Sequence, residues 1–302
     1  MIDNRDLKSL DREGDVPRVL LLGSRGFLGQ QFLELYPDAA TPRIDIADPV
    51  QVRKALREHQ PEVVVNCAGR CGSPNVDWCE DHKAETLHSN VTGPLVLLEE
   101  CEAQKAFLVH ISSGCIYSGD NGGKGFGEDD APNFAGSFYS RTKAWADQIF
   151  REFPALTLRL RMPFDDSLND RNLLMKIRRY QRVLTTPNSL TCLPDFMRAA
   201  NRLIDLRATG IFNVVNPGMI SPYEVMSMYR DIIDPAHTFE PLSEQQLGDV
   251  ARAGRSNCIL DTTKLENEGI FLPLVRDAVE EALRSLAPKL APAKVRDVCV
   301  SV

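Results

Sequence analysis

The sequence has 302 residues, 43% of them hydrophobic and 25% charged, so it can form one large α/β domain or two smaller ones with an ample core. Its 42 acidic and 35 basic side chains give a formal net charge of −7, which argues against a non-specific nucleic-acid binder. Its first residues lack the apolar segment of a signal peptide, and no apolar run approaches the roughly 18 residues that span a bilayer. We therefore expect a cytoplasmic protein.

Apolar runs alternate with helical periodicity along the first half of the chain. In chain order the patterns predict a strand at 16–23, helices at 26–36 and 48–60, a strand at 62–69, the end of a long helix at 91–104, a strand at 106–114, a helix at 140–153 and a strand at 155–162. Strands rich in Val, Ile and Leu that alternate with helices indicate a parallel sheet covered on both faces. The sequence therefore predicts a Rossmann-like, doubly wound α/β fold.

The second half is less regular. It predicts helices at 168–180 and 194–205, a strand at 210–218 that rejoins the sheet, and helices at 221–233 and 273–286. The patterns divide the chain into a Rossmann domain at 17–165, continued by about 182–216, and a smaller substrate-binding region made of 166–181 and 217–287. We expect the ends, 1–16 and 288–302, to be flexible extensions.

A glycine-rich turn joins the first predicted strand to the first predicted helix. It consists of Gly23, Ser24, Arg25, Gly26, Phe27, Leu28 and Gly29. Glycines in this place let the pyrophosphate of a dinucleotide approach the backbone N–H groups of the helix N-terminus. The spacing is GxxGxxG rather than the common GxGxxG. A plain turn remains an alternative, but the flanking strand and helix favour cofactor binding.

The residues that follow favour NADPH over NADH. NAD-binding units usually carry Asp or Glu about 20 residues beyond the first glycine, to bind the ribose 2′-hydroxyl. Here Arg43 lies at about that distance, beside Asp45, and Arg25 lies inside the glycine turn. Cations suit a 2′-phosphate, so these residues are candidate cofactor contacts, although two solvated arginines would give the same pattern.

Tyr139 and Lys143 form a YxxxK motif at the start of a predicted helix. The i,i+4 spacing places phenol and ammonium on one helical face. A neighbouring ammonium favours the phenolate and lowers a pKa that starts near 10, so we expect Tyr139 to exchange protons near neutral pH.

These motifs together resemble the extended short-chain dehydrogenase/reductases. The matching pieces, in family order, are GSRGFLG, NCAG (66–69), Asn90, ISS (111–113) and YSRTK (139–143). The resemblance implies that Ser113 and Tyr139 polarise a substrate carbonyl, Lys143 holds the nicotinamide ribose and NADPH delivers hydride. It also implies further cofactor contacts from Cys67, Ala68, Gly69, Asn90, Ser112 and Met162.

More specific segments resemble nucleotide-rhamnose synthase/epimerase-reductase, a family related to dTDP-4-dehydrorhamnose reductase. They lie at 74–86, 127–144, 158–164, 185–191, 213–221 and 255–265, and the resemblance spans about 17–286. This enzyme also forms the C-terminal half of plant rhamnose synthases. The resemblance implies one chain that epimerises and reduces UDP- or dTDP-4-keto-6-deoxyglucose to the nucleotide-linked L-rhamnose.

Cys115 and Lys176 are the candidate epimerase groups. Related reductases that only reduce usually have Asp-Tyr where this chain has Gly114-Cys115, whereas epimerising relatives resemble it in having Cys. Inverting C-3 and C-5 needs two acid/base groups flanking the sugar, and a thiol near cations can be one. Lys176 matches the position of the family's lysine, and burial or the nearby Arg178 and Arg179 would lower its pKa.

The resemblance also implies substrate contacts. The candidates are Asn75, Asp77, Cys79, Gly114, Phe138 and Asn188 around the sugar, with Arg255 and Asn257 at the nucleotide and diphosphate. A guanidinium suits phosphate. The family usually has Pro before that Arg where this chain has Gly254, and packing is the simpler explanation for Phe138.

Cysteine spacing gives no sign of a metal site. The eight cysteines form no CxxC pair, so we expect reduced thiols and no metal. The resemblance implies a homodimer through the Tyr139 helix and a separate 4,6-dehydratase that makes the substrate. Two rival functions stay open: a reductase that does not epimerise, and a non-catalytic regulatory subunit like that of methionine adenosyltransferase, which resembles the same reductases.

Overall fold

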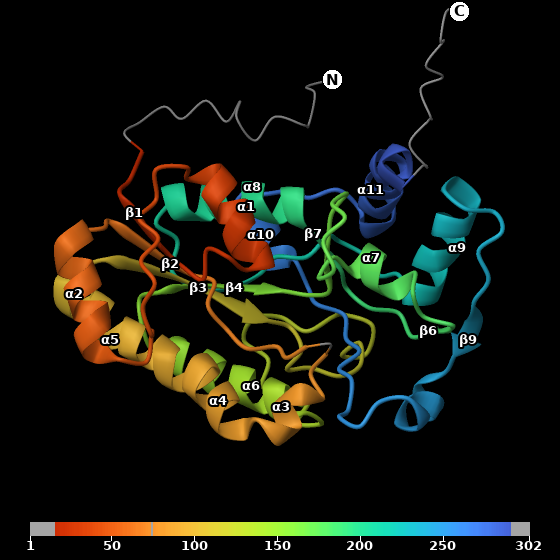
Figure 1. Cartoon of the computed structure of the whole chain (residues 1–302), viewed down its shortest axis with the longest axis horizontal. Coiled ribbons are helices and arrows are strands. Elements are labelled where there is room, and N and C mark those ends of the chain that lie inside the picture. The colour runs from red at the N-terminus through yellow and green to blue at the C-terminus, as the bar shows by residue number, and fades with distance from the viewer. Residues whose placement is uncertain (1–15, 74, 291–302) are drawn as a thin grey trace, which may run out of the picture.

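A five-stranded parallel sheet forms the centre of the molecule (Figure 1). The computed structural model describes residues 16–73 and 75–290. The strand order is β1-β2-β3-β4-β8, made of Val19–Leu22, Val63–Asn66, Phe107–Ser113, Leu156–Leu160 and Gly210–Asn213. Every neighbouring pair is parallel. The predicted doubly wound α/β fold is therefore confirmed, with strands shorter than the apolar runs that predicted them.

The direction in which the chain crosses the sheet from strand to strand reverses at β1. After α1 (Phe27–Leu35) it passes on the outer side of β1, where Ala40 makes an isolated parallel bridge to Leu20. Helix α2 (Pro49–His59) then returns it to β2 on the other side of β1. In open α/β sheets, ligands bind in the crevice at such a switch point, outside the carboxyl ends of the strands. The glycine turn lies there.

Helices cover both faces of the sheet (Figure 1). Helices α1, α8 (Leu193–Asp205) and α10 (Thr263–Asn267) lie on one face, and α2, α5 (Gly93–Gln104) and α6 (Phe138–Phe150) lie on the other. Phe32 meets Phe196 edge to face at 6.4 Å in the first layer, and His110 packs on Phe150 at 4.6 Å in the second. Both layers therefore have apolar cores that fix the sheet between them.

The segment after β2 is more helical than the sequence predicts. Short helices α3 (Trp78–Asp81) and α4 (Lys83–Leu87) lead through a π-helical turn, His88–Thr92, into α5. Such π-bulges are rare and occur frequently at functional sites, because they redirect one side chain of a helix. Here the turn contains Asn90.

A smaller region with its own core lies beside the carboxyl ends of the strands. It contains α7 (Leu173–Ile177), α9 (Pro222–Ile232), α11 (Val275–Leu290), the 3₁₀-helix Glu244–Asp249 and the strand pairs β5–β7 (Pro163–Phe164, Thr191–Cys192) and β6–β9 (Arg182–Leu184, Glu240–Leu242). Helix α7 is shorter than the predicted 168–180, because the Asn172 side chain hydrogen-bonds to Asp165 and Ser167 and holds the preceding residues in a loop. Helix α11 includes three residues of the predicted tail, and the rest of that tail and residues 1–15 lie outside the described residues.

A buried ion pair joins α6 to the sheet. Arg159 of β4 donates from Nε and Nη2 to the two carboxylate oxygens of Asp147 on α6, at 2.9 and 2.6 Å. Both side chains are 0% exposed. Because α6 also begins with Tyr139 and Lys143, this pair fixes the helix that carries them.

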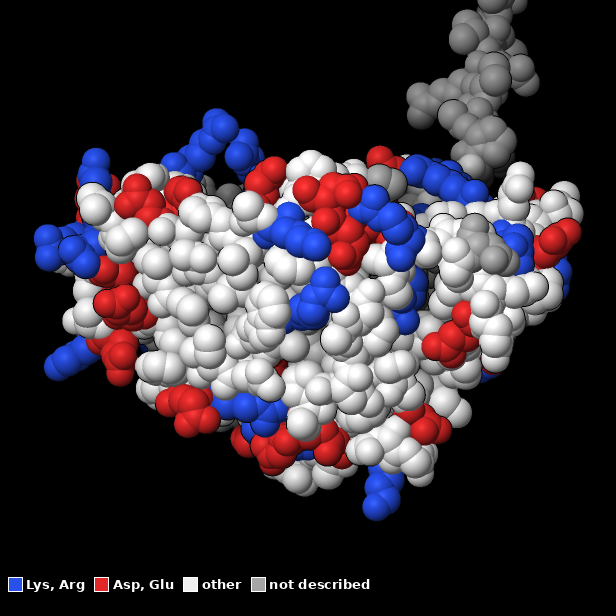
Figure 2. Space-filling model, turned by 90° about the horizontal axis from the view of Figure 1, so that it is seen from below, with Lys and Arg blue, Asp and Glu red and all other residues white. Residues whose placement is uncertain are grey.

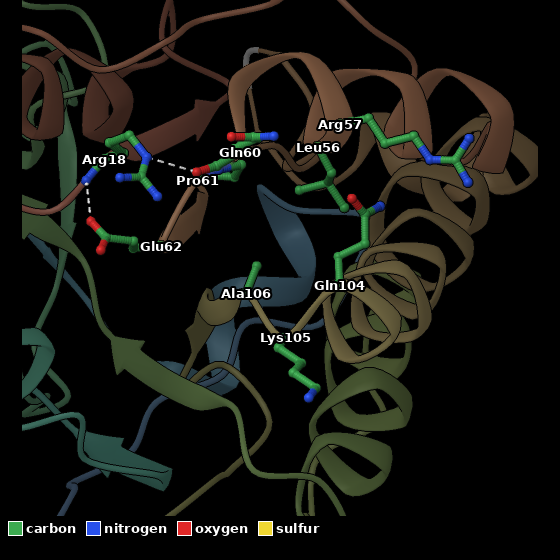
Figure 3. Close-up of a pocket in the computed structure, with 9 residues that line it drawn as sticks. All are labelled: Arg18, Leu56, Arg57, Gln60, Pro61, Glu62, Gln104, Lys105 and Ala106. Atoms are coloured by element: carbon green, nitrogen blue, oxygen red, sulfur yellow. Dashed lines mark hydrogen bonds between the residues drawn. The ribbon is translucent and has the colours of Figure 1, made fainter.

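The cavity shown in Figure 3 lies at the opposite end of the sheet from the motifs. It has a volume of about 490 Å³ and is lined by residues at the amino ends of β1, β2 and β3, among them Arg18, Glu62 and Lys105. Ligands of parallel sheets bind at the carboxyl ends, and this cavity contains no candidate catalytic residue. We therefore place the candidate site elsewhere.

Candidate active site

Two glycine positions of the turn are packed too closely to hold a side chain. A Cβ on Gly23, whose φ is +77°, would lie 2.6 Å from the Ala68 nitrogen, and a Cβ on Gly29 would lie 2.2 Å from the Gly23 carbonyl oxygen. Gly26 precedes α1, and no side chain caps that helix or places an acidic residue in its first turn. The N–H groups there can therefore hold an anion such as a pyrophosphate. Ser24, Phe27 and Leu28 are partly exposed around the turn.

The cations expected near the 2′-position are exposed. Arg25 and Arg43 make no ion pair with any described residue. Asp45 is occupied, because its carboxylate contacts His88 Nε2 at 2.9 Å, and this hydrogen bond holds the Asp45 pKa below its usual range. Arg25 and Arg43 are therefore cations unpaired within the described part of the chain and available to a negatively charged ribose substituent, while the Asp45 carboxylate is hydrogen-bonded to His88.

The loop after β2 is held by Asn90. Its side-chain oxygen accepts from the Arg70 nitrogen at 2.7 Å, and its amide donates to the Arg70 carbonyl at 2.8 Å. Asn66 accepts from the Ala68 nitrogen at 3.0 Å. Asn90 therefore holds the loop at Arg70, next to Cys67, Ala68 and Gly69, and its contact with the cofactor stays a prediction. Burial raises the pKa of the Cys67 thiol.

The Ser–Tyr–Lys group comes together as the motifs predict. Ser113 ends β3, its hydroxyl accepts from the Cys115 nitrogen at 3.1 Å, and it lies close enough to Tyr139 to lower the pKa of that phenol. Ser137 caps α6 by accepting from the Ser140 nitrogen at 3.1 Å, which sets the start of the helix beside the strand end. Lys143 donates from Nζ to the Ile111 carbonyl at 3.2 Å and lies 3.8 Å from where a Cβ on Gly69 would be. The ammonium thus lies between β3 and the loop after β2.

The expected lowering of the Tyr139 pKa is not found. Burial, the largest cause, raises the pKa of Tyr139 well above its usual value, and nearby thiols raise it further, while Ser113 opposes them. Burial lowers the pKa of Lys143 to about 8. The phenol is therefore protonated in this state, which is the form that donates a proton.

Ser112 hydrogen-bonds to the helix that carries Tyr139 and Lys143. Its hydroxyl donates to Asp147 at 3.4 Å in the buried layer under α6. Ser112 thus contacts the ion pair of α6 and β4, and its contact with the cofactor stays a prediction.

The two candidate epimerase groups face the same site from different elements. Cys115 follows β3, is half-buried, and lies close enough to raise the pKa values of Tyr139 and Lys143. Lys176 is half-buried on α7, and its pKa is lowered first by burial and then by Arg255 and Arg171. The cations that act on Lys176 are thus not the predicted Arg178 and Arg179, because Arg179 pairs with Asp170 instead.

Asp77 and Arg255 join the loop after β2 to the C-terminal loop. Arg255 Nη1 donates to the Asp77 carboxylate at 2.8 Å, and this hydrogen bond lowers the Asp77 pKa. Asn75 accepts from the Asp77 nitrogen at 2.8 Å and sets that turn. Among the described residues, Arg255 Nη2 and Nε make no hydrogen bond, so one edge of the guanidinium is available to a ligand.

The side chains of several predicted substrate contacts are already hydrogen-bonded or packed within the protein. Asn188 uses its whole hydrogen-bonding capacity on Arg161, the Cys258 nitrogen, the Thr186 carbonyl and Asn257, and it is 0% exposed. Asn257 bonds Asn188 and Glu244, Cys79 is 0% exposed, and Phe138 packs on Trp145 at 6.0 Å. These side chains support the site and leave little for a ligand. A Cβ on Gly114 would lie 2.6 Å from Leu260, so this position packs closely too.

Two residues at the site were missed. Cys71 is exposed, receives a hydrogen bond from Arg171 Nη1 at 2.9 Å, and influences the pKa values of Tyr139, Lys143 and Lys176. Arg161 is 1% exposed and contacts Cys115. A sequence signal existed for Arg161, since an arginine among buried strand residues needs a partner.

Within the described ranges, no helix is long and apolar enough to cross a membrane. Residues 16–73 and 75–290 contain no group of three or more His, Cys, Asp or Glu placed to hold a metal ion. The described cysteines are all free thiols, and Met162, after β4, has a φ of +41°, which is uncommon for a residue other than glycine.

Comparisons with known proteins confirm the predicted resemblance. The chain is 43% identical over 227 residues to the bifunctional dTDP-4-dehydrorhamnose 3,5-epimerase/dTDP-4-dehydrorhamnose reductase of Arabidopsis thaliana, covering 73% of this chain and 75% of that one. It is 36% identical over 273 residues to a trifunctional UDP-glucose 4,6-dehydratase/UDP-4-keto-6-deoxy-D-glucose 3,5-epimerase/UDP-4-keto-L-rhamnose-reductase of the same plant, covering 87% of this chain but only 41% of that one.

A solved structure agrees with the fold. The L780 UDP-rhamnose synthase from Acanthamoeba polyphaga mimivirus has a TM-score of 0.85 and 31% identity, covering 90% of this chain and 100% of that one. The model of the RmlD substrate binding domain matches residues 17–287. The chain therefore belongs to the RmlD substrate binding domain family, together with nucleotide-sugar epimerases and reductases.

Proposed function

We propose that the protein is an NADPH-dependent bifunctional enzyme that epimerises C-3 and C-5 of UDP- or dTDP-4-keto-6-deoxyglucose and reduces C-4, giving the nucleotide-linked L-rhamnose. The observation that carries this proposal is the grouping of Ser113, Tyr139 and Lys143 with the additional acid/base group Cys115. A reductase needs only the first three. The names of the relatives described above are consistent with both activities.

In the proposed reduction, Ser113, Tyr139 and Lys143 have separate roles. Ser113 and Tyr139 hydrogen-bond the C-4 carbonyl oxygen, and Tyr139, which is protonated in the free protein, donates its proton to the developing alkoxide. Lys143 lies where it can hold the ribose, and its ammonium compensates the negative charge left on the Tyr139 phenolate until solvent returns the proton. NADPH, when bound at the glycine turn, supplies hydride, and Arg25 and Arg43 suit its 2′-phosphate.

The epimerisation uses groups outside the Ser–Tyr–Lys set. A proton on the carbon next to the C-4 ketone is acidic, because its removal gives an enediolate that the hydrogen bonds from Ser113 and Tyr139 stabilise. Cys115 and Lys176 approach from different elements, as removal of a proton from one face and its return to the other require. Arg255 is the candidate phosphate contact.

Proton exchange tests the epimerase half without the reductase half. UDP- and dTDP-4-keto-6-deoxyglucose are each incubated with the protein in D₂O without NADPH, and proton NMR should show loss of the C-3 and C-5 signals. Cys115→Ser or Lys176→Met should slow exchange at one or both carbons by roughly 10²- to 10⁴-fold, because each removes an acid/base group. A repeat with NADP⁺ present ensures that the site is ordered.

The rivals give other outcomes of the same experiment. A reductase alone exchanges neither proton and remains fully active after Cys115→Ser on an already epimerised ketone. A regulatory subunit turns over no keto sugar and binds an enzyme in stoichiometric amount. Complete exchange by Cys115→Ser would contradict the role proposed for that thiol.

We further propose that the substrate comes from a separate 4,6-dehydratase in the cytoplasm. A 4-keto-6-deoxy sugar is the product of that reaction class. The trifunctional relative's name includes this activity, and this chain covers 41% of its length.

We also propose a homodimer that pairs α6 with α6. Figure 2 views the side of α4 and α6 and shows broad areas without charged residues. Trp145 and Ile149 on α6 and Leu87 on α4 are 42, 36 and 40% exposed. Sedimentation should give a dimer that Trp145→Glu converts to monomer, because a charge cannot be buried there. Phe271→Glu, at a residue 73% exposed and away from α6, should leave the dimer intact.

A further inference from the structure

Arg161 is a buried cation that touches the thiol of Cys115. It follows β4 and is 1% exposed. Its Nη1 lies 3.5 Å from Cys115 Sγ and donates to Ser256 Oγ at 2.9 Å. Its Nη2 donates to the Ser256 carbonyl at 2.8 Å and to the Asn188 side-chain oxygen. These contacts hold the guanidinium in one place, with one N–H directed at sulfur.

The contacts of Arg161 contain no carboxylate. Among the described residues no Asp or Glu lies within ion-pair distance of it, and its Nε is buried without a partner. A buried charge without a counter-charge is costly, so proteins pair such groups. Of the groups that Arg161 touches, only Cys115 can become an anion. The guanidinium therefore places a fixed positive charge beside this sulfur, at the position where the proposed mechanism needs a base.

We propose that Arg161 is a positioning residue that holds Cys115 as the thiolate base of the epimerisation. This inference adds a residue to the proposed function, and the role of Arg161 in catalysis rests on that proposed function. The thiolate takes the proton from the carbon next to the C-4 ketone, which leaves the enediolate and a neutral thiol. A proton then returns from the acid on the opposite face, and solvent restores both groups, so no redox step is involved. Arg161 stays protonated throughout.

A second thiol beside Arg161 has a different environment. Cys258 is 1% exposed and donates its S–H to the Gly114 carbonyl at 3.3 Å. Burial raises the pKa of Cys258, although Arg161 opposes this. The remaining titratable groups that act on Cys115 are Tyr139 and Lys143 from α6. Cys258 thus stays a neutral thiol and provides an internal comparison.

Alkylation of Cys115 measures its ionisation without any sugar. The full-length protein is treated with iodoacetamide between about pH 5.5 and 9.5, and peptide mass spectrometry gives the rate at each cysteine. Arg161→Met should move the half-maximal pH of Cys115 alkylation upward by about 1–3 units, since opposite charges at this range have that effect. At pH values below the half-maximal pH, a shift of this size lowers the rate of Cys115 alkylation tenfold or more. Arg161→Lys, which keeps the charge, should restore most of it.

Two controls separate charge from packing. Ser256→Ala removes one neutral hydrogen bond of the same guanidinium, which keeps its bonds to the Ser256 carbonyl and Asn188, so the Cys115 profile should shift much less than in Arg161→Met. Cys258→Ser should leave it unchanged. An unshifted profile in folded Arg161→Met, or an equal shift in Ser256→Ala, would overturn the proposal.

If Arg161→Met does not fold, the parent protein decides the question. Partial burial alone would raise the half-maximal pH of Cys115 alkylation above its value in urea, and the proposal expects the folded value to be no higher. A clearly higher folded value would overturn it. If the profile shifts as expected while the parent exchanges no sugar proton, the proposed function fails and the pairing of Arg161 with Cys115 stands.

Discussion

Tyr139→Phe should lower the rate of NADPH-dependent reduction by roughly 10²- to 10⁴-fold, the usual contribution of a positioned proton donor. In the proposed mechanism this phenol, which burial keeps protonated, gives its proton to the C-4 oxygen, while Ser113 orients the carbonyl. Phe keeps the ring and its packing. Loss of NADPH absorbance, followed with 4-keto-L-rhamnose nucleotide as substrate, measures this step directly.

The same variant should retain exchange of the C-3 and C-5 protons, with a smaller loss. Exchange needs Cys115 and Lys176, and loses only one hydrogen bond to the enediolate oxygen. Tyr117→Phe is the matched control, because that phenol is buried and donates to the Asp130 carbonyl at 2.8 Å. It should affect stability and leave reduction unchanged. Equal loss of exchange and reduction in Tyr139→Phe would mean that the two half-reactions do not use separate groups.

Asp147→Ala should destabilise the protein by about 3–5 kcal/mol, because removing one partner of a buried ion pair leaves the other charge without compensation. Arg159 is 0% exposed, and its remaining contacts, with the Glu128 carbonyl at 3.4 Å and Asn213 at 3.5 Å, are neutral and long. Ser112 would also lose its acceptor. Urea denaturation followed by circular dichroism gives the change in unfolding free energy.

The double variant Asp147→Leu/Arg159→Met should be closer to the parent than Asp147→Ala, since replacing both charges with apolar groups is often neutral. Glu280→Gln is the surface control. Its exposed pair with Arg284, four residues on, should contribute less than about 1 kcal/mol. A loss below 1 kcal/mol in Asp147→Ala would show that water reaches Arg159 and compensates its charge.

The sheet and the glycine turn could be predicted because their causes are local. Apolar runs and the Gly23–Gly29 spacing are visible in the sequence, and Tyr139 and Lys143 lie four residues apart on one helix. Cys115 and Lys176 have no such local signal, and only the family resemblance indicated them. Their roles and those of the other site residues stay predictions.

The sequence did not show the contacts of side chains whose partners are distant in sequence. Asn188 was expected to bind substrate, but its side chain bonds Asn257 and the Cys258 nitrogen, about seventy residues away. Ser112 was expected at the cofactor and bonds Asp147. Tyr139 was expected to have a lowered pKa, but the burial that opposes this depends on loops that the motif does not show. Long-range hydrogen bonds and desolvation cannot be read from spacing.

The bond between Asp77 and Arg255 joins residues 178 positions apart, and Arg161 reaches Ser256 across 95 positions. A ribosome makes about 5–20 residues per second, so the loop after β2 must wait roughly ten seconds or more for its partner. The glycine turn and β2 can pair long before that. The glycine turn is therefore in place early on a growing chain, whereas the sugar site can be completed only after residues 255 and 256 have been made.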